Sequence, residues 1–473
     1  MLVHKFGGTS VGNAERFANV ADIVIREHGK TRSHHLEGTV VVLSAMNGVT
    51  DQLITGARAA AEGKDTVYRE IKAQLLSRHL GIVEALLNRS RERLELCGLV
   101  EDHLHELERL YRSIAVLGEL TPRGCDVVAS FGEQLSTHIL AAVLRERGMR
   151  AQAISATELV VTDDHFGAAQ PVMEPTRARL QQQVKPLVER GVIPVITGYI
   201  AATEAGVTTT LGRGGSDYSA AIVGAGLEAD EVWIWSDVDG ILTADPNIVP
   251  QARTLTELSY DEAADLAYFG ADVLHPRTIR PVVESGIPLR ILNSFSPADP
   301  GTLIVDKPSP NRQLLPAIIS STGLSLIAVG QANDSWTLST PARLLQRLSE
   351  EGMDVLMFWQ SFSEHSLNLL LREQDQAHCL KVLRQEFRNG AHNSFSLGTK
   401  EKVSTISVVG VPGWQRNGTG IVSQAFAALG RHSTRIIAVA QPATEYSVSF
   451  CIPEEQMPDT VRFLHRELGL EEG

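Results

Sequence analysis

Short apolar runs alternate with longer amphipathic stretches over residues 1–304, and this alternation constrains the fold more than any other feature. Val40–Leu43, Val192–Ile196 and Val232–Trp235 are apolar, Val- and Ile-rich runs, which is typical of strands buried on both faces. Strands separated by helices form a mainly parallel sheet with helices on its faces. We therefore expect residues 1–304 to be an α/β domain, a three-layer sandwich around such a sheet. Leu and Ile at helical spacing over 68–117 predict a helical insertion on this scaffold.

A change of composition marks the end of that domain. Residues 293–301 and 308–311 are rich in Pro, Ser, Asn and Gly, as interdomain connections often are. We place a linker at 305–316.

An internal repeat follows the linker. Leu326–Gly330 resembles Ile406–Gly410, and Gln360–Ser366 resembles Gln441–Ser447. A helical pattern lies between the members of each pair, so each copy is expected to run strand, helix, strand, turn, strand.

The two copies are placed at 317–398 and 399–473, with their helices at 340–351 and 419–431. Two small α+β units of this kind can pair their sheets side by side and form a small-molecule site at their seam. A dimer interface without a ligand is the alternative, and a regulatory role is favoured.

Charge and cysteine usage restrict the partners and the compartment. The net charge of −13 argues against a surface for nucleic acid or for an anionic membrane. The four cysteines are scattered, with no CxxC pair and no zinc-like His spacing, which fits a reduced compartment. The N-terminus has no apolar signal-peptide core, and no apolar run approaches the ~20 residues of a membrane span. We expect a cytoplasmic protein with no nucleic-acid or membrane partner.

The first motif with chemical content is Lys5-Phe6-Gly7-Gly8-Thr9-Ser10, which lies between a short apolar strand and a helical pattern. Two glycines at such a turn let backbone N–H groups approach a phosphate at the positive end of a helix, and Lys5 would add a charge. The spacing is neither the GxxxxGK[ST] of a P-loop nor the GxGxxG of a dinucleotide fold. By itself, a Gly-Gly pair after a strand is more often only a tight turn.

A second Gly-rich turn, Arg213-Gly214-Gly215-Ser216-Asp217, also precedes a helical run. Arg213 suits bidentate binding of a carboxylate. Ser216 is a candidate N-cap of the helix, and Asp217 is a candidate for a charge that complements the helix dipole. These structural roles leave Arg213 unexplained, so a ligand site is predicted here.

Three carboxylates, Asp237, Asp239 and Asp245, follow the apolar run 232–235. Together they could hold a nucleotide or a metal. Each alone is more often structural, because Asp-Gly and Asp-Pro are ordinary turn signals.

Two quieter segments complete the set. Residues 44–50 form a polar turn after a buried strand, and Ser130-Phe-Gly-Glu133 matches a capping box before the helical run 134–147. On the sequence pattern alone, Glu133 is interpreted as a helix cap.

Taken together, these segments resemble the aspartate kinase family within the amino-acid kinase superfamily, and the repeat resembles the pair of ferredoxin-type ACT domains behind such kinases. The closest resemblance is to the kinase portion of bifunctional aspartokinase–homoserine dehydrogenases. Since the sequence ends at Gly473, a monofunctional enzyme is expected. The matched elements, in the family's order, are KFGGTSV at 5–11, VLSAMNGVT at 42–50, SFGEQLS at 130–136, VITGYIA at 195–201, TTTLGRGGSDYSA at 208–220, SDVDGILTADP at 236–246 and YFGADVLHPRTI at 268–279.

The resemblance implies an amino-acid kinase fold and transfer of a phosphoryl group from ATP, with Mg²⁺, to the side-chain carboxylate of L-aspartate. The product would be 4-phospho-L-aspartate, the first intermediate towards lysine, threonine and methionine. Lys5 would stabilise the transferring phosphoryl group, and Asp217 would orient the reacting carboxylate, Lys5 or Mg²⁺. The implied aspartate-binding residues are Arg213 at the α-carboxylate and Glu133 at the amino group, with Ser44, Thr50, Tyr199, Gly214, Gly215 and Ser216 around them. The implied ATP-binding residues are Lys5, Gly7, Gly8, Ser10, Ser236, Asp237, Leu242, Asn247 and Asp272.

Two positions depart from the family's pattern. Asp272 stands where Lys is frequent, and Asn247 stands where Arg is frequent. Both changes remove positive charge expected near the phosphates. We expect them to be tolerated, because Lys5, Arg213 and Asp217 are retained.

Other functions stay open on the sequence. One is an amino-acid kinase that acts on acetylglutamate, glutamate, carbamate or UMP. The other is an amino-acid sensor with a weakened kinase site.

The repeats imply feedback by an end-product amino acid, bound at their seam near Gln360, Ser363, Gln441 and Thr444. Likeness to the bifunctional enzymes favours threonine, with lysine second. The ACT-like domains also predict a homodimer or a homotetramer.

Overall fold

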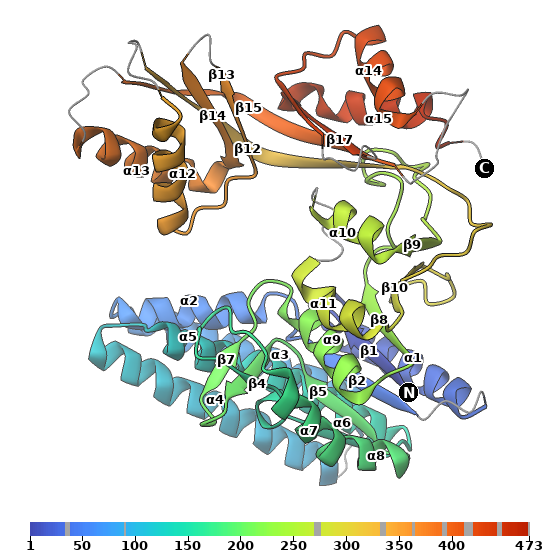
Figure 1. Cartoon of the computed structure of the whole chain (residues 1–473). Helices are drawn as coiled ribbons and strands as arrows, with labels where there is room; N and C mark the ends of the chain where they lie inside the picture. The colour runs from blue at the N-terminus through green and yellow to red at the C-terminus, as the bar shows by residue number, and fades with distance from the viewer. Residues whose placement is uncertain are drawn as a thin grey trace. The chain divides into compact units, whose positions relative to one another are not determined.

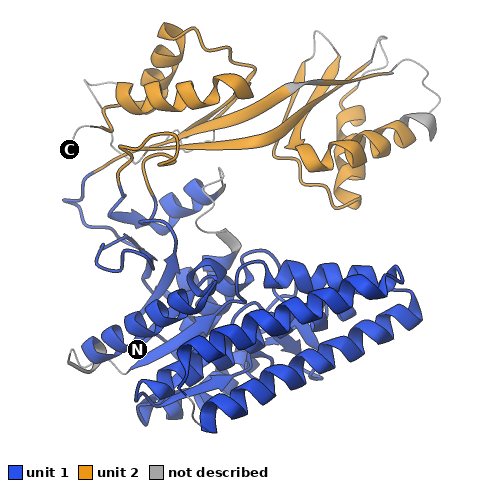
Figure 2. Cartoon of the chain, turned by 180° about the vertical axis from the view of Figure 1, so that it is seen from behind, with its two compact units in different colours: residues 1–241, 254–268, 272–313 blue, residues 242–253, 269–271, 314–473 orange. Residues whose placement is uncertain are grey.

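The structure is a computed structural model that describes residues 1–33, 38–88, 91–268, 276–331, 337–361, 365–389, 395–410, 420–441 and 447–471. The chain divides into two compact units (Figures 1 and 2). The first is drawn from residues 1–241, 254–268 and 272–313, and the second mainly from residues 242–253 and 314–473.

The first unit is built on an eight-stranded sheet within the described residues, in the order β3-β5-β2-β1-β8-β10-β11-β9. Neighbouring strands are parallel except for β10 and β11, which are antiparallel. The α/β class with a mainly parallel sheet is confirmed. The strands are β1 (Leu2–Phe6), β2 (Thr39–Leu43), β3 (Ala151–Ile154), β5 (Ile193–Thr197), β8 (Glu231–Ser236), β9 (Glu257–Ser259), β10 (Leu289–Asn293) and β11 (Thr302–Val305).

The central strands are buried because they have helices on both faces. Every residue of β1, β2 and β5 is buried, as expected for uninterrupted apolar runs in a parallel sheet. On one face α9 (Gly215–Leu227) packs on β1, β2 and β8 and contacts α7 (Met173–Gln183) and α11 (Pro276–Ser285). On the other face lie α1 (Ala14–Ser33) and α6 (Phe131–Glu146).

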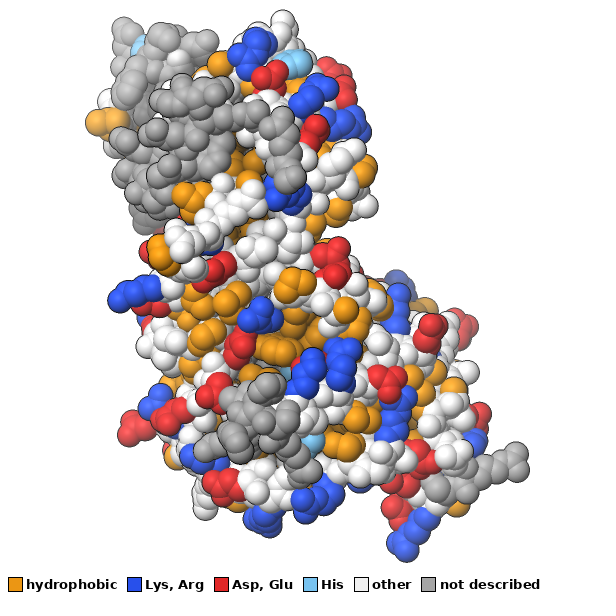
Figure 3. Space-filling model, turned by 90° about the vertical axis from the view of Figure 1, so that its right-hand side faces the viewer, with side chains coloured by type: hydrophobic (Ala, Val, Ile, Leu, Met, Phe, Trp, Pro, Cys, Tyr) orange, Lys and Arg blue, Asp and Glu red, His pale blue; other side chains and the backbone are white. Residues whose placement is uncertain are grey.

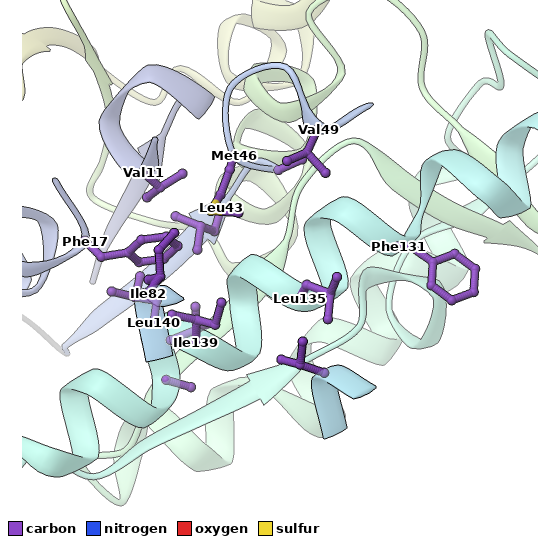
Figure 4. Close-up of a cluster of buried hydrophobic side chains, with 14 of the residues drawn as sticks. Val11, Phe17, Leu43, Met46, Val49, Ile82, Phe131, Leu135, Ile139 and Leu140 are labelled. Carbon is purple, nitrogen blue, oxygen red and sulfur yellow. The ribbon is translucent and has the colours of Figure 1, made fainter. Parts of the chain in front are cut away.

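The core on the α1 and α6 face joins distant parts of the sequence. Figure 4 shows Ile139 and Leu140 of α6 gathered with Phe17 of α1 and Leu43 of β2. The expected helical insertion is present as α3 (Asp65–Leu86) and α4 (Arg91–Leu117), which pack on each other and add their apolar faces to this core. The remaining helices of the unit are η1 (Gly8–Val11), α2 (Val49–Ala61), α5 (Pro122–Ala129), η2 (Ala156–Glu158), α8 (Lys185–Glu189) and α10 (Tyr260–Tyr268).

One stretch of the described chain, Pro122–Glu146, is long and apolar enough to cross a membrane by length and composition. It comprises α5 and α6, and 83% of its most apolar window is buried inside the protein. The expectation that no apolar run approaches the length of a membrane span is therefore wrong for this stretch. Its apolar side chains fill the core.

A smaller sheet lies in the same unit, in the order β4-β6-β7. Its strands are β4 (Val161–Thr162), β6 (Ile200–Thr203) and β7 (Thr208–Thr210). β6 and β7 are antiparallel, and β7 leads directly into the Gly-rich turn before α9. This sheet therefore positions the turn before α9 that carries Arg213.

The second unit contains a six-stranded sheet in the order β13-β14-β12-β15-β17-β16. Each repeat has helices packed on its half of this sheet. The strands are β12 (Ala317–Gln331), β13 (Met357–Ser361), β14 (Ser366–Arg372), β15 (Phe395–Val409), β16 (Ala438–Ala440) and β17 (Ser447–Pro453), and the helices are α12 (Ser339–Glu350), η3 (Glu373–Asp375), α13 (Gln376–Asn389), α14 (Ile421–Arg431), η4 (Glu454–Gln456) and α15 (Met457–Glu467).

The paired repeat is confirmed, with two differences from the expectation. Each copy has a second helix, α13 or α15, that the repeat comparison did not include. The boundary placed between 398 and 399 falls inside β15, which pairs with β12 along nearly its whole length through register shifts near Ser321–Leu324. The two copies therefore share their long central strands, because each long strand bends at these irregularities and serves both halves.

A segment from within the 1–304 range belongs to the second unit. Residues 242–253 leave the first unit after Ile241, and Ala244 and Val249 join the core of the second repeat. Thr243 Oγ1 lies 3.0 Å from Nε2 of the buried His465, and the N–H of Ile318 donates to the Thr243 carbonyl at 2.7 Å. The two units are therefore interleaved along the chain.

The surface carries charges of both signs, and the cysteines are unpaired with one another. On the face in Figure 3, acidic and basic side chains of the described residues alternate over the surface. All four cysteines are free thiols, and burial raises the pKa of both Cys379 and Cys451 to about 12.

Candidate functional site

The predicted site residues of the first unit gather at the carboxyl edge of the central sheet. Strands β5, β2, β1, β8 and β10 are parallel neighbours in this order, so their carboxyl ends lie side by side (Figure 1). Ligands of open parallel sheets bind at this edge. The residues that follow the strands are Tyr199 after β5, Ser44 after β2, Gly7 after β1 and Asp237 after β8.

A buried ion pair lies at the centre of this edge. Lys5 Nζ, near the end of β1, lies 2.5 Å from Asp217 Oδ1, in the first turn of α9. The two side chains are 11% and 18% exposed. The pair places a cation and a carboxylate together beside the two Gly-rich turns.

The turn before α9 depends on its glycines. Gly212 and Gly214 have positive φ of 78° and 68°, and Gly214 is the N-cap of α9, a conformation that favours glycine. A Cβ on Gly215 would lie 2.6 Å from the Tyr199 ring. Ser216 makes no capping bond, because the helix has already begun at Gly215, so the prediction that Ser216 caps α9 is wrong.

Tyr199 itself is held in an unusual backbone conformation. Its φ is 65°, which costs about 1–3 kcal/mol for a residue with a side chain. Its N–H donates to Ser219 Oγ of α9 at 2.9 Å, and its carbonyl accepts from Leu211 N at 2.9 Å. The side chain is half-buried and hydrogen-bonds to Thr210. The strained residue thus connects β5, α9 and the Arg213 turn.

The Gly7-Gly8 turn is packed against the turn after β2. A Cβ on Gly8 would lie 2.8 Å from the Ala45 carbonyl oxygen, and Asn47 N donates to the Gly8 carbonyl at 3.1 Å. Gly7 is the N-cap of η1 and has an extended conformation, and a Cβ there would make ordinary van der Waals contacts, the nearest at 3.5 Å from Lys5 Nζ. The Gly7-Gly8 turn therefore packs closely against the turn after β2, and a role in phosphate binding stays a prediction.

Ser10 differs from the prediction that it cradles phosphate. The residue is 1% exposed, and its Oγ lies 2.9 Å from Ser294 Oγ, which in turn donates to the Ser236 carbonyl. Its N–H donates to the Gly7 carbonyl. Ser10 therefore ties η1 to Ser294, the residue that follows β10, and both its polar groups have internal partners.

Glu133 is buried in the first turn of α6. It is 3% exposed, and Oε2 has no hydrogen-bond partner among the described residues. Burial raises its pKa to about 8, although a hydrogen bond from the Ala45 backbone opposes this shift. The N-cap Ser130 makes no side-chain capping bond, so the capping-box interpretation is wrong. A buried carboxyl group with an unpartnered oxygen is instead suited to a cation brought by a ligand.

Three other predicted aspartate-site residues occupy turns and a helix start in the same unit. Ser44 is half-buried, and its carbonyl accepts from Ser136 of α6 at 2.7 Å. Thr50 is half-buried near the start of α2. Arg213 is exposed in the turn before α9. Ser44 directly follows β2, and Arg213 and Asp217 lie on either side of the start of α9.

The predicted ATP-binding residues divide between the units. Ser236 ends β8, and its Oγ donates to Asp237 Oδ1 at 3.2 Å. Leu242 and Asn247 belong to the second unit. Asp272 lies outside the described residues.

The carboxylates after β8 have structural roles. Asp239 Oδ1 accepts from Asn293 Nδ2 at 2.7 Å, and Asp245 Oδ1 accepts from the N–H and Nδ2 of Asn247. Asp239 and Asp245 are therefore turn residues, in agreement with the interpretation that each aspartate alone is structural. Within the described residues there is no cluster of three His, Cys, Asp or Glu that could hold a metal ion.

Sequence reasoning missed two residues that connect the site's loops. Arg78 of α3 donates to the Asn47 and Gly12 carbonyls, both at 3.0 Å, and so ties the loop after β2 to the loop after β1. Asp126 of α5 is 3% exposed and binds the end of β7. The only available signal for Asp126 was a charge within an apolar helical run, a position where a buried partner is required.

The effector positions do not share one seam. Gln360 is in β13 and Gln441 directly follows β16, and these strands are the two opposite edges of the six-stranded sheet. The repeats pair through β12 and β15, and this pairing places Gln360 and Gln441 at opposite outer edges of the sheet. The prediction that both residues lie at a single seam within one chain is therefore wrong. Ser363 and Thr444 lie outside the described residues. Gln360 Nε2 is buried without a hydrogen-bond partner among the described residues.

Comparisons with known proteins agree with this arrangement. Residues 1–293 match the amino acid kinase family and residues 406–468 match the ACT domain. Aspartokinase 1 of Arabidopsis thaliana is 31% identical over 98% of this chain and 79% of its own length. A bifunctional aspartokinase/homoserine dehydrogenase 2 of the same plant is 32% identical over 99% of this chain, which spans 50% of that relative.

Solved structures give the same answer for the fold. Escherichia coli aspartokinase III is 29% identical and is matched over 99% of both chains. The TM-score is 0.79 for its R-state complex with aspartate and ADP and 0.80 for its T-state complex with lysine and aspartate. The chain therefore belongs to the amino acid kinase family and, within it, to the aspartokinases.

Proposed function

We propose that the chain transfers the γ-phosphoryl group of ATP to the β-carboxylate of L-aspartate, giving ADP and 4-phospho-L-aspartate. The observation that carries this proposal is the Lys5–Asp217 pair at the carboxyl edge of the sheet. It lies in the same unit as two Gly-rich turns and the buried, unpartnered carboxyl oxygen of Glu133. Relatives named as aspartokinases match this chain along nearly its whole length.

The chemistry needs little from a general base. A β-carboxylate has a reference pKa of about 3.9, so it is an anionic nucleophile at neutral pH. The difficulty is to bring this anion to an anionic phosphoryl group. Lys5 and the backbone N–H groups of the Gly-rich turns would stabilise the charge that develops on the transferring group. The phosphoryl–oxygen bond to ADP breaks as the bond to the carboxylate forms.

Each part of the aspartate molecule has a group of suitable charge. Arg213 would bind the α-carboxylate through its planar guanidinium, and Glu133 would accept the ammonium group at its unpartnered Oε2. Tyr199 and Ser44 would line the pocket between them. An acceptor with both an ammonium group and a second carboxylate is thereby favoured over UMP or carbamate.

Mg²⁺ would arrive with the nucleotide. Mg²⁺ prefers oxygen ligands and is often bound through phosphates with one or two carboxylates, which fits a site where Asp217 is the nearby carboxylate beside Lys5. When bound, the ion neutralises charge on the phosphates. Asp217 would hold the ion and Lys5 at fixed positions relative to each other.

The test is a phosphorylation assay that presents L-aspartate, acetylglutamate, glutamate, carbamate and UMP with ATP and Mg²⁺. The acyl phosphate is trapped with hydroxylamine as the aspartyl hydroxamate, and ADP release is followed in parallel. We expect aspartate, and none of the other acceptors, to give hydroxamate and ADP in equal amounts. ADP formed with another acceptor would reassign the substrate. Calorimetry that detects no ATP·Mg²⁺ binding would favour an amino-acid sensor.

We also propose feedback through the second unit, with lysine as the first candidate and threonine as the second. Lysine is placed first because a solved relative with a matching overall structure is a lysine complex in its T-state. Assays at sub-saturating aspartate with each amino acid would test this. A ligand that inhibits by shifting the protein from an active to an inactive state must bind these two states with different affinities.

A further inference from the structure

Asp126 is a buried carboxylate that the mechanism above does not use. It lies in α5, is 3% exposed, and accepts three hydrogen bonds. Its Oδ2 accepts from Gly167 N at 2.9 Å and from Thr210 N at 3.0 Å, and its Oδ1 accepts from Thr210 Oγ1 at 2.8 Å. A buried charge that satisfies three donors on two other segments fixes the position of those segments.

Both segments held by Asp126 border the Gly-rich turn. Thr210 is the last residue of β7, three residues before Arg213. Gly167 also contacts the turn, since a Cβ on Gly212 would lie 3.0 Å from the Gly167 carbonyl oxygen. Ala169 N donates to the Thr210 carbonyl at 2.9 Å and holds the same two segments together.

The helix that carries Asp126 is followed directly by the helix that carries Glu133. α5 ends at Ala129 and α6 begins at Phe131, so Asp126 and Glu133 lie on consecutive helices joined through one residue. Tyr199, whose side chain hydrogen-bonds to Thr210, has both Glu133 and Asp126 as electrostatic neighbours. The Asp126 carboxylate thus connects the Arg213 turn to the Glu133 helix.

We propose that Asp126 is a positioning residue that sets the placement of Arg213 relative to Glu133, and so selects an acceptor with the spacing of aspartate's α-carboxylate and ammonium groups. This inference rests on the proposed function. A displacement of about 1 Å at a binding group can cost on the order of 100-fold in an enzyme's efficiency. Asp126 makes no contact with the acceptor and acts through β7 and the Gly167 segment.

Two substitutions separate geometry from charge. Asp126→Asn keeps the shape, because its amide oxygen can accept from both backbone N–H groups while its NH₂ group donates to Thr210 Oγ1. Asp126→Ala removes all three bonds. We expect Asp126→Ala to raise the KM for aspartate by about tenfold or more, with the KM for ATP changed by less than about twofold. Asp126→Asn should restore the KM for aspartate to within about threefold of the wild type.

Two further variants guard against a general loss of folding. Thr210→Val removes the hydroxyl bond to Asp126, and with it the bond between Thr210 and the Tyr199 side chain, but keeps the backbone bond to Asp126. A rise of about threefold in the KM for aspartate is expected even if Asp126→Ala does not fold. Thr176→Val is the matched control. Thr176 is fully buried in α7 and binds the backbone of Val161 and Val172, so its loss should lower the thermal midpoint without separating the two KM values.

The outcomes distinguish the inference from the proposed function. A wild-type enzyme that does not phosphorylate aspartate overturns both. With an active wild type, an unchanged KM for aspartate in both Asp126→Ala and Thr210→Val overturns the inference alone. It is also overturned if Asp126→Asn is as impaired as Asp126→Ala, or if Thr176→Val gives the same split between the two KM values.

Discussion

Lys5 Nζ and Asp217 Oδ1 lie 2.5 Å apart, although their residues are far apart along the chain. The strand β1 brings one and the start of α9 brings the other, and both side chains are mostly buried. In a site of low exposure, a cation has a stronger effect on a developing negative charge than it would in water. The pair also holds Lys5 in place, so that the ammonium group needs little reorganisation during phosphoryl transfer.

Lys5→Ala is therefore expected to lower kcat by about 10²-fold or more, since one preorganised donor to the transition state is lost. The measurement is the steady-state kcat with aspartate and ATP, with circular dichroism to confirm that the fold is retained. Lys64→Ala is the control, because its ion pair with Glu62 is exposed and such pairs contribute little to stability. Wild-type turnover in Lys5→Ala would remove Lys5 from the mechanism.

Glu133 should make aspartate binding depend on pH. Burial raises its pKa to about 8 in the free enzyme, so below that pH the carboxyl group is protonated and must lose its proton to bind the ammonium group. The KM for aspartate should therefore fall by up to about tenfold per unit as pH rises from 6 towards 8. Calorimetry in buffers of different ionisation enthalpy should detect proton release on aspartate binding at pH 7. Glu133→Gln should bind weakly at every pH, and a pH dependence that persists in this variant would contradict the assignment.

The same residue predicts how the unliganded protein responds to pH. A carboxyl group whose folded pKa is raised contributes stability that is fully present below its unfolded pKa, near 4.5, and is lost as pH rises through about 8. Between these values the free energy of unfolding should fall by up to about 1.4 kcal/mol per pH unit from this group. The thermal midpoint of Glu133→Gln, measured beside the wild type from pH 5 to pH 9, should lack this contribution. Parallel curves for the two proteins would show that Glu133 titrates normally.

Much of the catalytic fold could be predicted because the decisive signals were local. The runs 40–43 and 232–235 are apolar enough that burial on both faces was the simplest outcome. They became β2, which is wholly buried, and β8, in which Trp233 stays partly exposed. The Gly-rich turns were also visible as strand-to-helix junctions. By contrast, Glu133 matched a capping pattern, and only its tertiary surroundings show that the side chain is buried away from the cap.

What could not be predicted depends on partners distant in sequence. Asp126 has its donors on β7 and on the Gly167 segment, and no spacing rule connects them to α5. The edge positions of Gln360 and Gln441 follow from which strands of the two repeats pair, a choice that the repeat itself left open. Likewise, the short segment 242–253 carries no compositional sign that it joins the second unit.

Gly8→Ala should impair ATP binding, because its Cβ would lie 2.8 Å from the Ala45 carbonyl oxygen and 3.2 Å from Asn47 N. These are backbone atoms, so the turn itself must shift. We expect the KM for ATP to rise by about tenfold or more, with a smaller change for aspartate. Gly81→Ala is the control, since a Cβ there meets open space within α3 and should stabilise the helix slightly. Equal KM values for ATP in Gly8→Ala and the wild type would exclude this turn from the nucleotide site.

Arg213→Ala should raise the KM for aspartate by about 100-fold, with little change for ATP, because a charged, bidentate contact to the α-carboxylate is lost. Arg213→Lys keeps the charge without the planar fork and should recover only part of the affinity. Kinetics with each substrate varied in turn measure the split. A similar rise in both KM values would mean that Arg213 does not bind the α-carboxylate.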